Sequence, residues 1–350
     1  MMRNIIDFST VSNEEFDKIY NLTCDIMADP AKYSKALEGK IMASLFFEPS
    51  TRTSLSFTTA MYRLGGKVIG FNDANASSTA KGESLKDTIT IVSKYSDIVV
   101  MRNPREGSAL AASMYAEVPF INAGDGGHLH PTQTLTDLIT IKKYRGSLDN
   151  MTVGLCGDLK YGRTVHSLIK SLSKYENIKF VLISPVELQV PKYISDFLDE
   201  SNIDYRVEID LQANLPELDI LYMTRVQKER FDDFFEYERL KNIYVLDKKR
   251  LELAKKDMLI LHPLPRVDEI SNDIDEDPRA VYFEQAECGM YGRMALILTL
   301  LRTNERVAPE KIVGIDSPKI CSNIRCITQI EEYLPIIDEK ICPYCDKEME

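Results

Sequence analysis

Residues 47–54 read Phe-Glu-Pro-Ser-Thr-Arg-Thr-Ser, and they stand between two segments of different pattern. The preceding segment, 41–47, is mostly apolar and predicts a buried strand, whereas the run that begins at Leu55 has the spacing of a helix. A helix begins with unsatisfied N–H groups and a partial positive charge. The polar side chains at this junction therefore suit either an ordinary helix cap or a phosphate site: Ser50, Thr51, Arg52 and Thr53.

Short apolar segments alternate with helical segments along most of the chain. Apolar strands without polar alternation are typical of parallel sheets that helices cover on both faces. Their number fits two sheets of four or five strands, so we predict an α/β fold with two doubly wound parallel-sheet domains and a boundary near Pro131. The other predicted strands are 97–101, 118–122, 151–156, 179–183, 218–223, 243–246 and 258–261, and the predicted helices include 12–27, which opens with a capping box, 132–144 and 163–174.

The composition is that of an ordinary soluble protein. The chain has 350 residues, of which 44% are hydrophobic and 28% charged, and its net charge is −11. No apolar run is long enough to span a membrane, and the first residues do not form a signal peptide, so we expect a cytoplasmic location. The negative charge argues against a nucleic-acid partner, although a local group of arginines would still bind an anionic substrate.

Polar residues gather directly after five of the predicted strands. In open α/β sheets the ligand binds beyond the carboxyl ends of the strands. Each cluster alone also suits a surface ion pair or a turn, but four of the five contain an arginine, which favours a site that holds anions and stabilises developing negative charge. A phosphate-bearing donor and a dicarboxylate fit such a site. The clusters are Arg102, 124–130, 158–163, 224–227 and 262–266.

These motifs resemble those of the aspartate/ornithine carbamoyltransferases, over about residues 1–306. Residues 47–53 are similar to the carbamoyl-phosphate motif of that family. The ornithine branch typically has H-P-C-Q and H-C-L-P where this chain has His130-Pro-Thr-Gln133 and His262-Pro-Leu-Pro265, so the resemblance is to the aspartate branch. It implies transfer of the carbamoyl group of carbamoyl phosphate to L-aspartate, which gives N-carbamoyl-L-aspartate and phosphate in de novo pyrimidine (UMP) biosynthesis. Two further motifs that resemble this branch are 157–166 and 223–230.

The resemblance assigns the carbamoyl-phosphate site to the first domain and the following helix. Thr53, Arg102 and His130 would contact the carbamoyl carbonyl and stabilise its oxyanion, and Gln133 would hold the carbamoyl amino group. The departing phosphate would accept the amine proton. The residues implied to bind carbamoyl phosphate are Ser50, Thr51, Arg52, Thr53, Arg102, His130 and Gln133.

The resemblance also implies a second substrate site and a homotrimer with shared sites, and it leaves assembly beyond the trimer open. Ser77 and Lys81 would come from the neighbouring subunit. Arg163 would bind the α-carboxylate of aspartate, and Arg225 with Gln227 the β-carboxylate, while backbone carbonyls would orient the amine. The residues implied to bind aspartate are Lys81, Arg163, Arg225, Gln227, Leu264 and Pro265. With a last helix at 289–301, the implied domains are 1–131 with 288–306 for carbamoyl phosphate and 132–287 for aspartate.

Four of the seven cysteines fall in the last thirty residues of the sequence. The spacing of Cys321, Cys326, Cys342 and Cys345 predicts one structural zinc ion per chain, because 307–350 cannot bury much core without it. Free thiols on a disordered tail are the alternative. The tail resembles the zinc domain of the separate aspartate carbamoyltransferase regulatory chain, without the nucleotide-binding domain of that chain. We therefore expect a fused module that packs on a catalytic domain, and no organic cofactor.

Two other functions are consistent with parts of this pattern. One is a carbamoyltransferase for another amino acid, and the other is an inactive homologue that acts as a scaffold. A scaffold is expected to have lost site residues, and none of the motif positions is missing.

Overall fold

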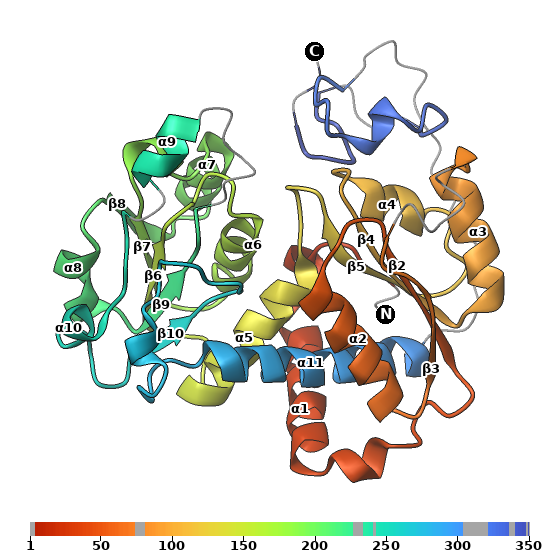
Figure 1. Ribbon diagram of the computed structural model, residues 1–350, viewed down its shortest axis with the longest axis horizontal. Helices are drawn as coiled ribbons and strands as arrows, with labels where there is room; N and C mark the ends of the chain where they lie inside the picture. The colour runs from red at the N-terminus through yellow and green to blue at the C-terminus, as the bar shows by residue number, and fades with distance from the viewer. Residues whose placement is uncertain are drawn as a thin grey trace. The chain divides into compact units, whose positions relative to one another are not determined.

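The computed structural model describes residues 4–73, 81–226, 234–240, 243–303, 321–335, 340–347 and 349. The chain divides into two compact units, Met1–Thr132 with Met290–Glu350, and Gln133–Gly289. Each unit contains one five-stranded parallel sheet (Figure 1), as the sequence predicts. The two changes of unit fall inside helices, α5 (Pro131–Arg145) and α11 (Tyr282–Thr303).

The sheet of the first unit has the strand order β1-β5-β4-β2-β3. Its central strands are buried on both faces, which explains why they are apolar without alternation. On one face, Leu45 and Met101 share a core cluster with α3 (Leu85–Tyr95) and α4 (Ser108–Ser113). The strands are β1 (Asn4–Ile5), β2 (Ile41–Phe46), β3 (Lys67–Phe71), β4 (Ile98–Asn103) and β5 (Phe120–Asp125).

Two other helices of this unit begin where the sequence predicts. Helix α1 (Asn13–Ala28) has Ser12 as its N-cap, and Ser12 and Glu15 form the expected capping box. Helix α2 (Thr51–Arg63) follows β2 directly and packs against β2 and β3 with Phe57 and Met61 buried. The motif at 47–54 therefore lies at a strand-to-helix junction at the carboxyl end of the sheet.

The sheet of the second unit has the order β10-β9-β6-β7-β8. Its core includes Leu221, Met223 and Ile260 from the strands, together with Leu246 and Ile274 from the loops. The strands are β6 (Met151–Cys156), β7 (Ile178–Ile183), β8 (Asp204–Glu208), β9 (Ile220–Met223) and β10 (Leu259–Leu261). The helices are α6 (Arg163–Leu172), α7 (Lys192–Glu200), α8 (Leu211–Asn214), α9 (Phe234–Leu240) and α10 (Lys248–Leu251).

Three predictions of secondary structure need correction. The predicted strand at 243–246 is wrong, because Leu246 makes only a single bridge with Ile270. The edge strands β3 and β8 were not predicted, since they are largely exposed and carry polar residues. Helix α11 begins at Tyr282 rather than near residue 289, so the polar residues before Gly289 belong to the helix.

The described part of 321–349, which we call the module, belongs to the first unit (blue in Figure 1). It contains one short 3-10 helix, η9 (Ile327–Gln329), and several turns. Its Leu334, Tyr344 and Met349 belong to the same core cluster as α3, α4 and the first sheet. Among the described helices of the whole chain, none has the length and apolar character that a membrane span requires.

Candidate active site and metal centre

The start of α2 leaves the hydroxyl of its N-cap residue unused by the helix. Ser50 occupies the N-cap position, but its side chain makes no capping hydrogen bond. The side chains of Thr51 and Arg52 are exposed, and those of Ser50 and Thr53 are half-buried. An ordinary cap would direct the hydroxyl to the N2 or N3 amide. The geometry therefore favours the ligand-binding interpretation of this motif over the capping one.

Arg102 lies beside this motif at the end of β4. The Phe47 amide donates to the Arg102 carbonyl at 2.8 Å, and Arg102 Nη2 forms an ion pair with Glu48 Oε1 at 2.7 Å. Arg102 Nη1 lies 3.5 Å from His130 Nε2, which accepts from it in the neutral tautomer that carries its proton on Nδ1. Gly124 makes room for this pair, because a Cβ there would lie 3.2 Å from Arg102 Nη1. The phosphate motif, Arg102 and His130 thus share one edge of the first sheet.

In the second unit, the loops after β6 and β9 are bonded to each other. The Thr224 hydroxyl accepts from the Asp158 amide at 2.9 Å and donates to the Cys156 carbonyl at 3.0 Å. Gly157 has a φ of 117°, and a Cβ there would lie 2.3 Å from the Thr224 carbonyl oxygen. Arg163 begins α6 at the end of one loop, and Arg225 directly follows Thr224 in the other; both side chains are half-buried.

Gln133 is held by the buried carboxylate of Asp137, which is not among the predicted site residues. Gln133 Nε2 donates to Asp137 Oδ1 at 2.7 Å, and Gln285 Nε2 donates to the same oxygen at 2.6 Å. The Tyr222 hydroxyl donates to Asp137 Oδ2 at 3.1 Å, and burial raises the pKa of Tyr222 well above its usual range. The sequence does contain a signal for this contact, because Asp137 follows Gln133 by four positions and residues four apart lie on the same face of a helix.

The segment 262–266 is organised by hydrogen bonds within its own unit. His262 Nδ1 accepts from the Leu264 amide at 2.7 Å, and His262 Nε2 lies 2.7 Å from Glu269 Oε1. Leu264 has a φ of 54° and precedes a cis bond to Pro265. Arg266 Nη2 pairs with Asp275 Oδ2 at 2.6 Å. Arg266, like Arg102, therefore pairs with a carboxylate of its own unit.

Lys81 is exposed, just before α3. Ser77 and Gln227 lie outside the described residues.

Comparisons with known proteins identify the family. Residues 3–143 match the family described as "Aspartate/ornithine carbamoyltransferase, carbamoyl-P binding domain", and residues 149–300 match "Aspartate/ornithine carbamoyltransferase, Asp/Orn binding domain". The chain belongs to the aspartate/ornithine carbamoyltransferase family. The aspartate carbamoyltransferase catalytic subunit of Clostridium novyi (strain NT) is 60% identical over 299 residues, which cover 85% of this chain and 98% of that protein.

Solved carbamoyltransferase structures have the same fold. The catalytic subunit of aspartate transcarbamoylase from M. jannaschii superposes with a TM-score of 0.80 at 46% identity, covering 87% of this chain and 100% of that one. Aspartate transcarbamoylase from Trypanosoma cruzi, solved with carbamoyl phosphate and aspartate, has a TM-score of 0.80 at 39% identity and covers 85% of this chain and 96% of that one. The second family match ends at residue 300, before the cysteine cluster.

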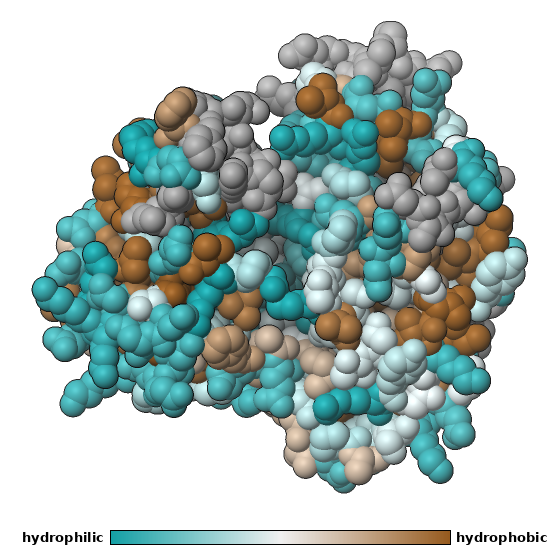
Figure 2. Space-filling view, in the orientation of Figure 1, coloured by the Kyte–Doolittle hydropathy of each residue, from teal (hydrophilic) through white to brown (hydrophobic). Residues whose placement is uncertain are grey.

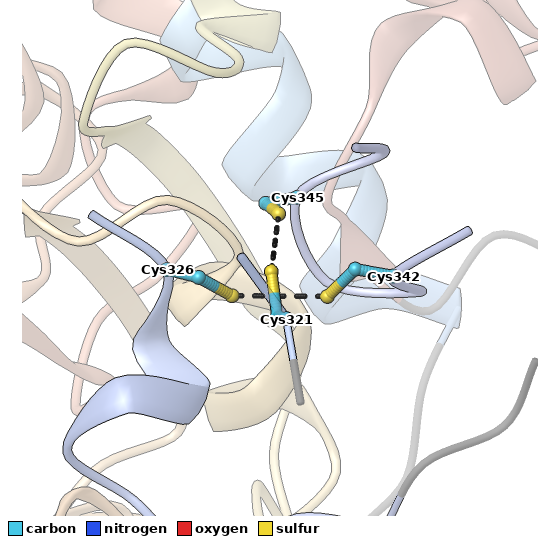
Figure 3. A group of neighbouring side chains, drawn as sticks. All are labelled: Cys321, Cys326, Cys342 and Cys345. Atoms are coloured by element: carbon cyan, nitrogen blue, oxygen red, sulfur yellow. Dashed lines mark hydrogen bonds between the residues drawn. The ribbon is translucent and has the colours of Figure 1, made fainter. Parts of the chain in front are cut away.

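The four cysteines of the module lie together and are buried (Figure 3). All four sulfur atoms lie within 4.8 Å of one another, with Sγ–Sγ distances of 3.5 Å for Cys321–Cys345 and 3.8 Å for Cys326–Cys342. Zinc–thiolate bonds of about 2.3 Å in a tetrahedron place the sulfurs about 3.8 Å apart, so this set fits a metal ion such as zinc. The Thr328 hydroxyl donates to Cys326 Sγ at 3.2 Å, which is typical of the shell around a bound metal.

The remaining cysteines are not members of this cluster. Cys156 and Cys288 are buried and Cys24 is half-buried. Burial raises the pKa of the Cys156 thiol, which lies in β6 and has little thiolate character. This supports the prediction that Cys156 fills the core rather than acting as a nucleophile.

Proposed function

We propose that this chain is an aspartate carbamoyltransferase that transfers the carbamoyl group of carbamoyl phosphate to L-aspartate, giving N-carbamoyl-L-aspartate and phosphate for pyrimidine (UMP) biosynthesis. The observation that carries the proposal is the group formed by the α2 N-terminus, Arg102 and His130 at one sheet edge. It occurs in a chain that covers 98% of the C. novyi aspartate carbamoyltransferase catalytic subunit at 60% identity.

The first step is binding of carbamoyl phosphate at the α2 N-terminus. The first amides of the helix and its partial positive charge attract the phosphate, and Arg52 adds a charge-assisted hydrogen bond. Hydroxyls of Ser50, Thr51 and Thr53 complete the set of donors. Glu48 holds the Arg102 guanidinium from one side at 2.7 Å, which orients its remaining donors.

The chemical step forms a C–N bond and breaks the C–O bond to phosphate. As the aspartate amine attacks the carbamoyl carbon, negative charge develops on the carbonyl oxygen. Arg102, His130 and the Thr53 hydroxyl donate hydrogen bonds to that oxygen and stabilise the tetrahedral intermediate. The intermediate collapses with release of phosphate, which takes the proton from the amine. This assignment needs no covalent intermediate with the protein.

The second substrate is bound by residues of the second unit. Arg163 binds the α-carboxylate of aspartate, and Arg225 with Gln227 binds the β-carboxylate. The backbone carbonyls of Leu264 and Pro265 orient the amine. A further residue on the carbamoyl group is Gln133: because its amide nitrogen donates to Asp137, its oxygen is left to accept from the carbamoyl amino group. We also propose the domain limits given above, 1–131 with 288–306 and 132–287.

We further propose a homotrimer in which Ser77 and Lys81 complete the site of a neighbouring subunit. Large hydrophobic side chains are exposed on an edge strand and two helices of the first unit, and Figure 2 shows such side chains near α3 and β3 at the right of the view. An apolar surface of this kind is typical of a protein interface. The exposed residues on α2, β3 and α3 are Leu55, Tyr62, Ile69, Ile91 and Tyr95.

For the module, we propose one structural zinc ion per chain, held by the four cysteine thiolates. Four thiolates close a tetrahedral site and leave no position for substrate, so the ion supplies folding energy and no catalytic step. With its Cys-x4-Cys and Cys-x2-Cys spacing the module resembles the zinc domain of the aspartate carbamoyltransferase regulatory chain. We propose that it is a fused counterpart of that domain.

The test is the rate of N-carbamoyl-L-aspartate formation from carbamoyl phosphate and L-aspartate, with L-ornithine as the control amine. We expect activity with aspartate alone. Arg52→Ala is expected to reduce the rate about 100- to 1,000-fold, because a charged donor to the substrate is lost. Arg302→Ala, which removes the same charge from an exposed position at the end of α11, is the matched control and should retain the rate. Activity with ornithine, or with neither amine, would overturn the proposal.

A further inference from the structure

We propose that the module positions the segment that contains Lys81. Through Glu331 and Tyr333 it completes the N-terminus of α3, and it thereby fixes the residues that directly follow Lys81. This inference rests on the proposed function, because that function gives Lys81 its place on the aspartate bound to a neighbouring subunit.

The first amides of α3 have partners from two different parts of the chain. The first four backbone N–H groups of a helix have no hydrogen-bond partner within the helix. Local capping side chains usually satisfy one or two of them. Here the local cap, Ser84, accepts only from the Asp87 amide among the first three, at 3.0 Å. The Leu85 amide donates to Glu331 Oε1 at 2.8 Å, and the Lys86 amide donates to the Tyr333 hydroxyl at 3.0 Å. Two of the first three amides of α3 therefore depend on the module.

The side chain of Lys86 adds a second contact at the same place. Its Nζ lies 5.5 Å from the ring centre of Tyr115, which follows α4, and 5.8 Å from the ring centre of Tyr333. The two rings meet edge to face with their centres 5.9 Å apart. A cation between two aromatic rings stabilises their approach, so Tyr333 is held against the first unit by both its hydroxyl and its ring.

A second set of contacts ties the module to the loop that follows Arg102. The Glu106 amide donates to the Arg325 carbonyl at 3.0 Å, and the Ile327 amide donates to the Glu106 carbonyl at 2.9 Å. The Glu106 carboxylate is buried and accepts from Asn323 Nδ2 at 2.7 Å. The module is thus bonded both to the start of α3 and to the loop after β4, on the sheet edge where Arg102 lies.

A pocket of about 640 Å³ lies along this boundary and joins the module to the phosphate motif. Phe47 of the motif lines it together with Ser84, Arg105 and Glu331. Besides Glu331, the acidic residues Glu83 and Glu332 line the pocket against one arginine, so its charge does not suit a second anionic ligand. We therefore assign this boundary a positioning role rather than a binding one.

The metal-binding cysteines determine where Glu331 lies. Glu331 and Tyr333 follow Cys326 through η9, and the Gln329 side chain donates to the Cys321 carbonyl at 2.5 Å. Loss of the metal would separate the four thiols and release this segment. The position of Lys81 would then depend on the metal, although the metal contacts no substrate.

Three variants test the inference. Glu331→Ala removes the acceptor of the Leu85 amide. Glu331→Gln removes the same charge but keeps an oxygen that accepts a hydrogen bond. Glu332→Ala removes a charge at the neighbouring exposed position. The measurements are amide hydrogen exchange at Leu85 and Lys86, kcat and KM for aspartate, and zinc content, all on the full chain.

We expect Glu331→Ala to exchange the Leu85 amide about tenfold faster and to raise KM for aspartate about fivefold, with one zinc ion retained. Glu331→Gln and Glu332→Ala should behave as wild type in all three measurements. If Glu331→Ala left the exchange of the Leu85 amide unchanged, or made it faster without changing kcat or KM, the inference would be overturned. Activity of the wild type with aspartate would still support the proposed function in that case. A wild type inactive with aspartate would instead overturn the proposed function, and the exchange data would still report whether the module closes α3.

Discussion

The two sheet-containing units and the module are stabilised in different ways. Each sheet has fully buried strands whose side chains form a core with their own helices, such as Phe120 in the first unit and Phe180 in the second. The buried apolar residues of the module, among them Leu334 and Tyr344, belong instead to the core of the first unit. Each sheet buries its apolar side chains within its own unit, whereas the module is expected to need both the proposed zinc ion and the surface of the first unit.

The largest effect should come from loss of a metal ligand. Cys326→Ser removes one of four thiolates from a site whose metal contributes roughly 10–16 kcal/mol to folding in small zinc domains. We expect zinc content to fall from one ion per chain to none. Amides of the module and the first turn of α3 should lose protection from hydrogen exchange, while those of β2 and β6 keep it. Cys24→Ser is the matched control, since Cys24 lies outside the cluster; a protected module in Cys326→Ser would contradict the comparison.

A substitution in the core of a sheet should lower the stability of the fold without changing the zinc content. Phe180 is buried in β7, and Phe180→Ala should lower the free energy of unfolding by about 3–5 kcal/mol through loss of buried area and a cavity. Zinc content should stay at one ion per chain. Urea denaturation measures the first quantity and metal analysis the second. Phe235→Ala, at a side chain that is 82% exposed, should change stability by less than about 0.5 kcal/mol.

A smaller effect is expected where the module packs against the first unit. Gly107 has a φ of 79°, and a Cβ there would lie 2.4 Å from the Tyr344 Cβ and carbonyl oxygen. Gly39 has a φ of 83° with no atom within 4 Å of such a Cβ. Both Gly→Ala variants place a side chain in the left-handed region, which costs about 1–2 kcal/mol.

Only Gly107→Ala should also displace the module. We therefore expect its loss of stability in thermal unfolding to exceed that of Gly39→Ala, together with faster exchange at the Leu85 amide. Equal effects of the two variants would show that the close packing of Tyr344 on Gly107 contributes nothing.

The smallest effect concerns pH. His128 lies 3.2 Å from Asp125 and 3.0 Å from Asp346 of the module. Burial alone would lower its pKa, but hydrogen bonds and charge from the two carboxylates raise the pKa of His128 to about 10. Because the folded pKa lies above the unfolded value of about 6.5, the stabilisation is fully present below pH 6.5 and is lost as pH rises through 10.

The measurement is thermal unfolding of wild type and His128→Gln at several pH values. We expect the advantage of wild type to shrink between pH 6.5 and pH 10. His166→Gln is the control, because burial lowers the pKa of His166 to about 4 and its contribution should be constant over that range. A difference between wild type and His128→Gln that does not change with pH would show that His128 is not charged.

Much of the fold was predictable because buried parallel strands have a strong apolar signal. The strand β6 and the Ser12 cap of α1 were predicted to the residue. The edge strand β3 was missed because its exposed residues carry no such signal. The apolar run at 243–246 was misassigned, since Leu246 is buried by packing against the second core and not by strand pairing.

The candidate site was predictable as a set of strand-end residues, but its internal partners were not. Arg102 and His130 follow apolar strands, which the sequence displays directly. Arg102 pairs with Glu48, which is distant in the sequence. In the same way, Asp137 joins Gln133 to the distant Gln285. No local pattern reports such contacts, and for the same reason the pairing of Arg266 with Asp275 was not anticipated.

The covalent link between the module and the first unit has a further consequence. The contacts of Glu106 and Glu331 join two parts of one chain, so their association is intramolecular and dilution does not reverse it. Joining two binding parts in one chain raises their effective concentration, which reaches the millimolar range in proteins with short linkers. Contacts too weak to join two separate chains at micromolar concentration therefore suffice here, and every molecule carries one module for each first unit.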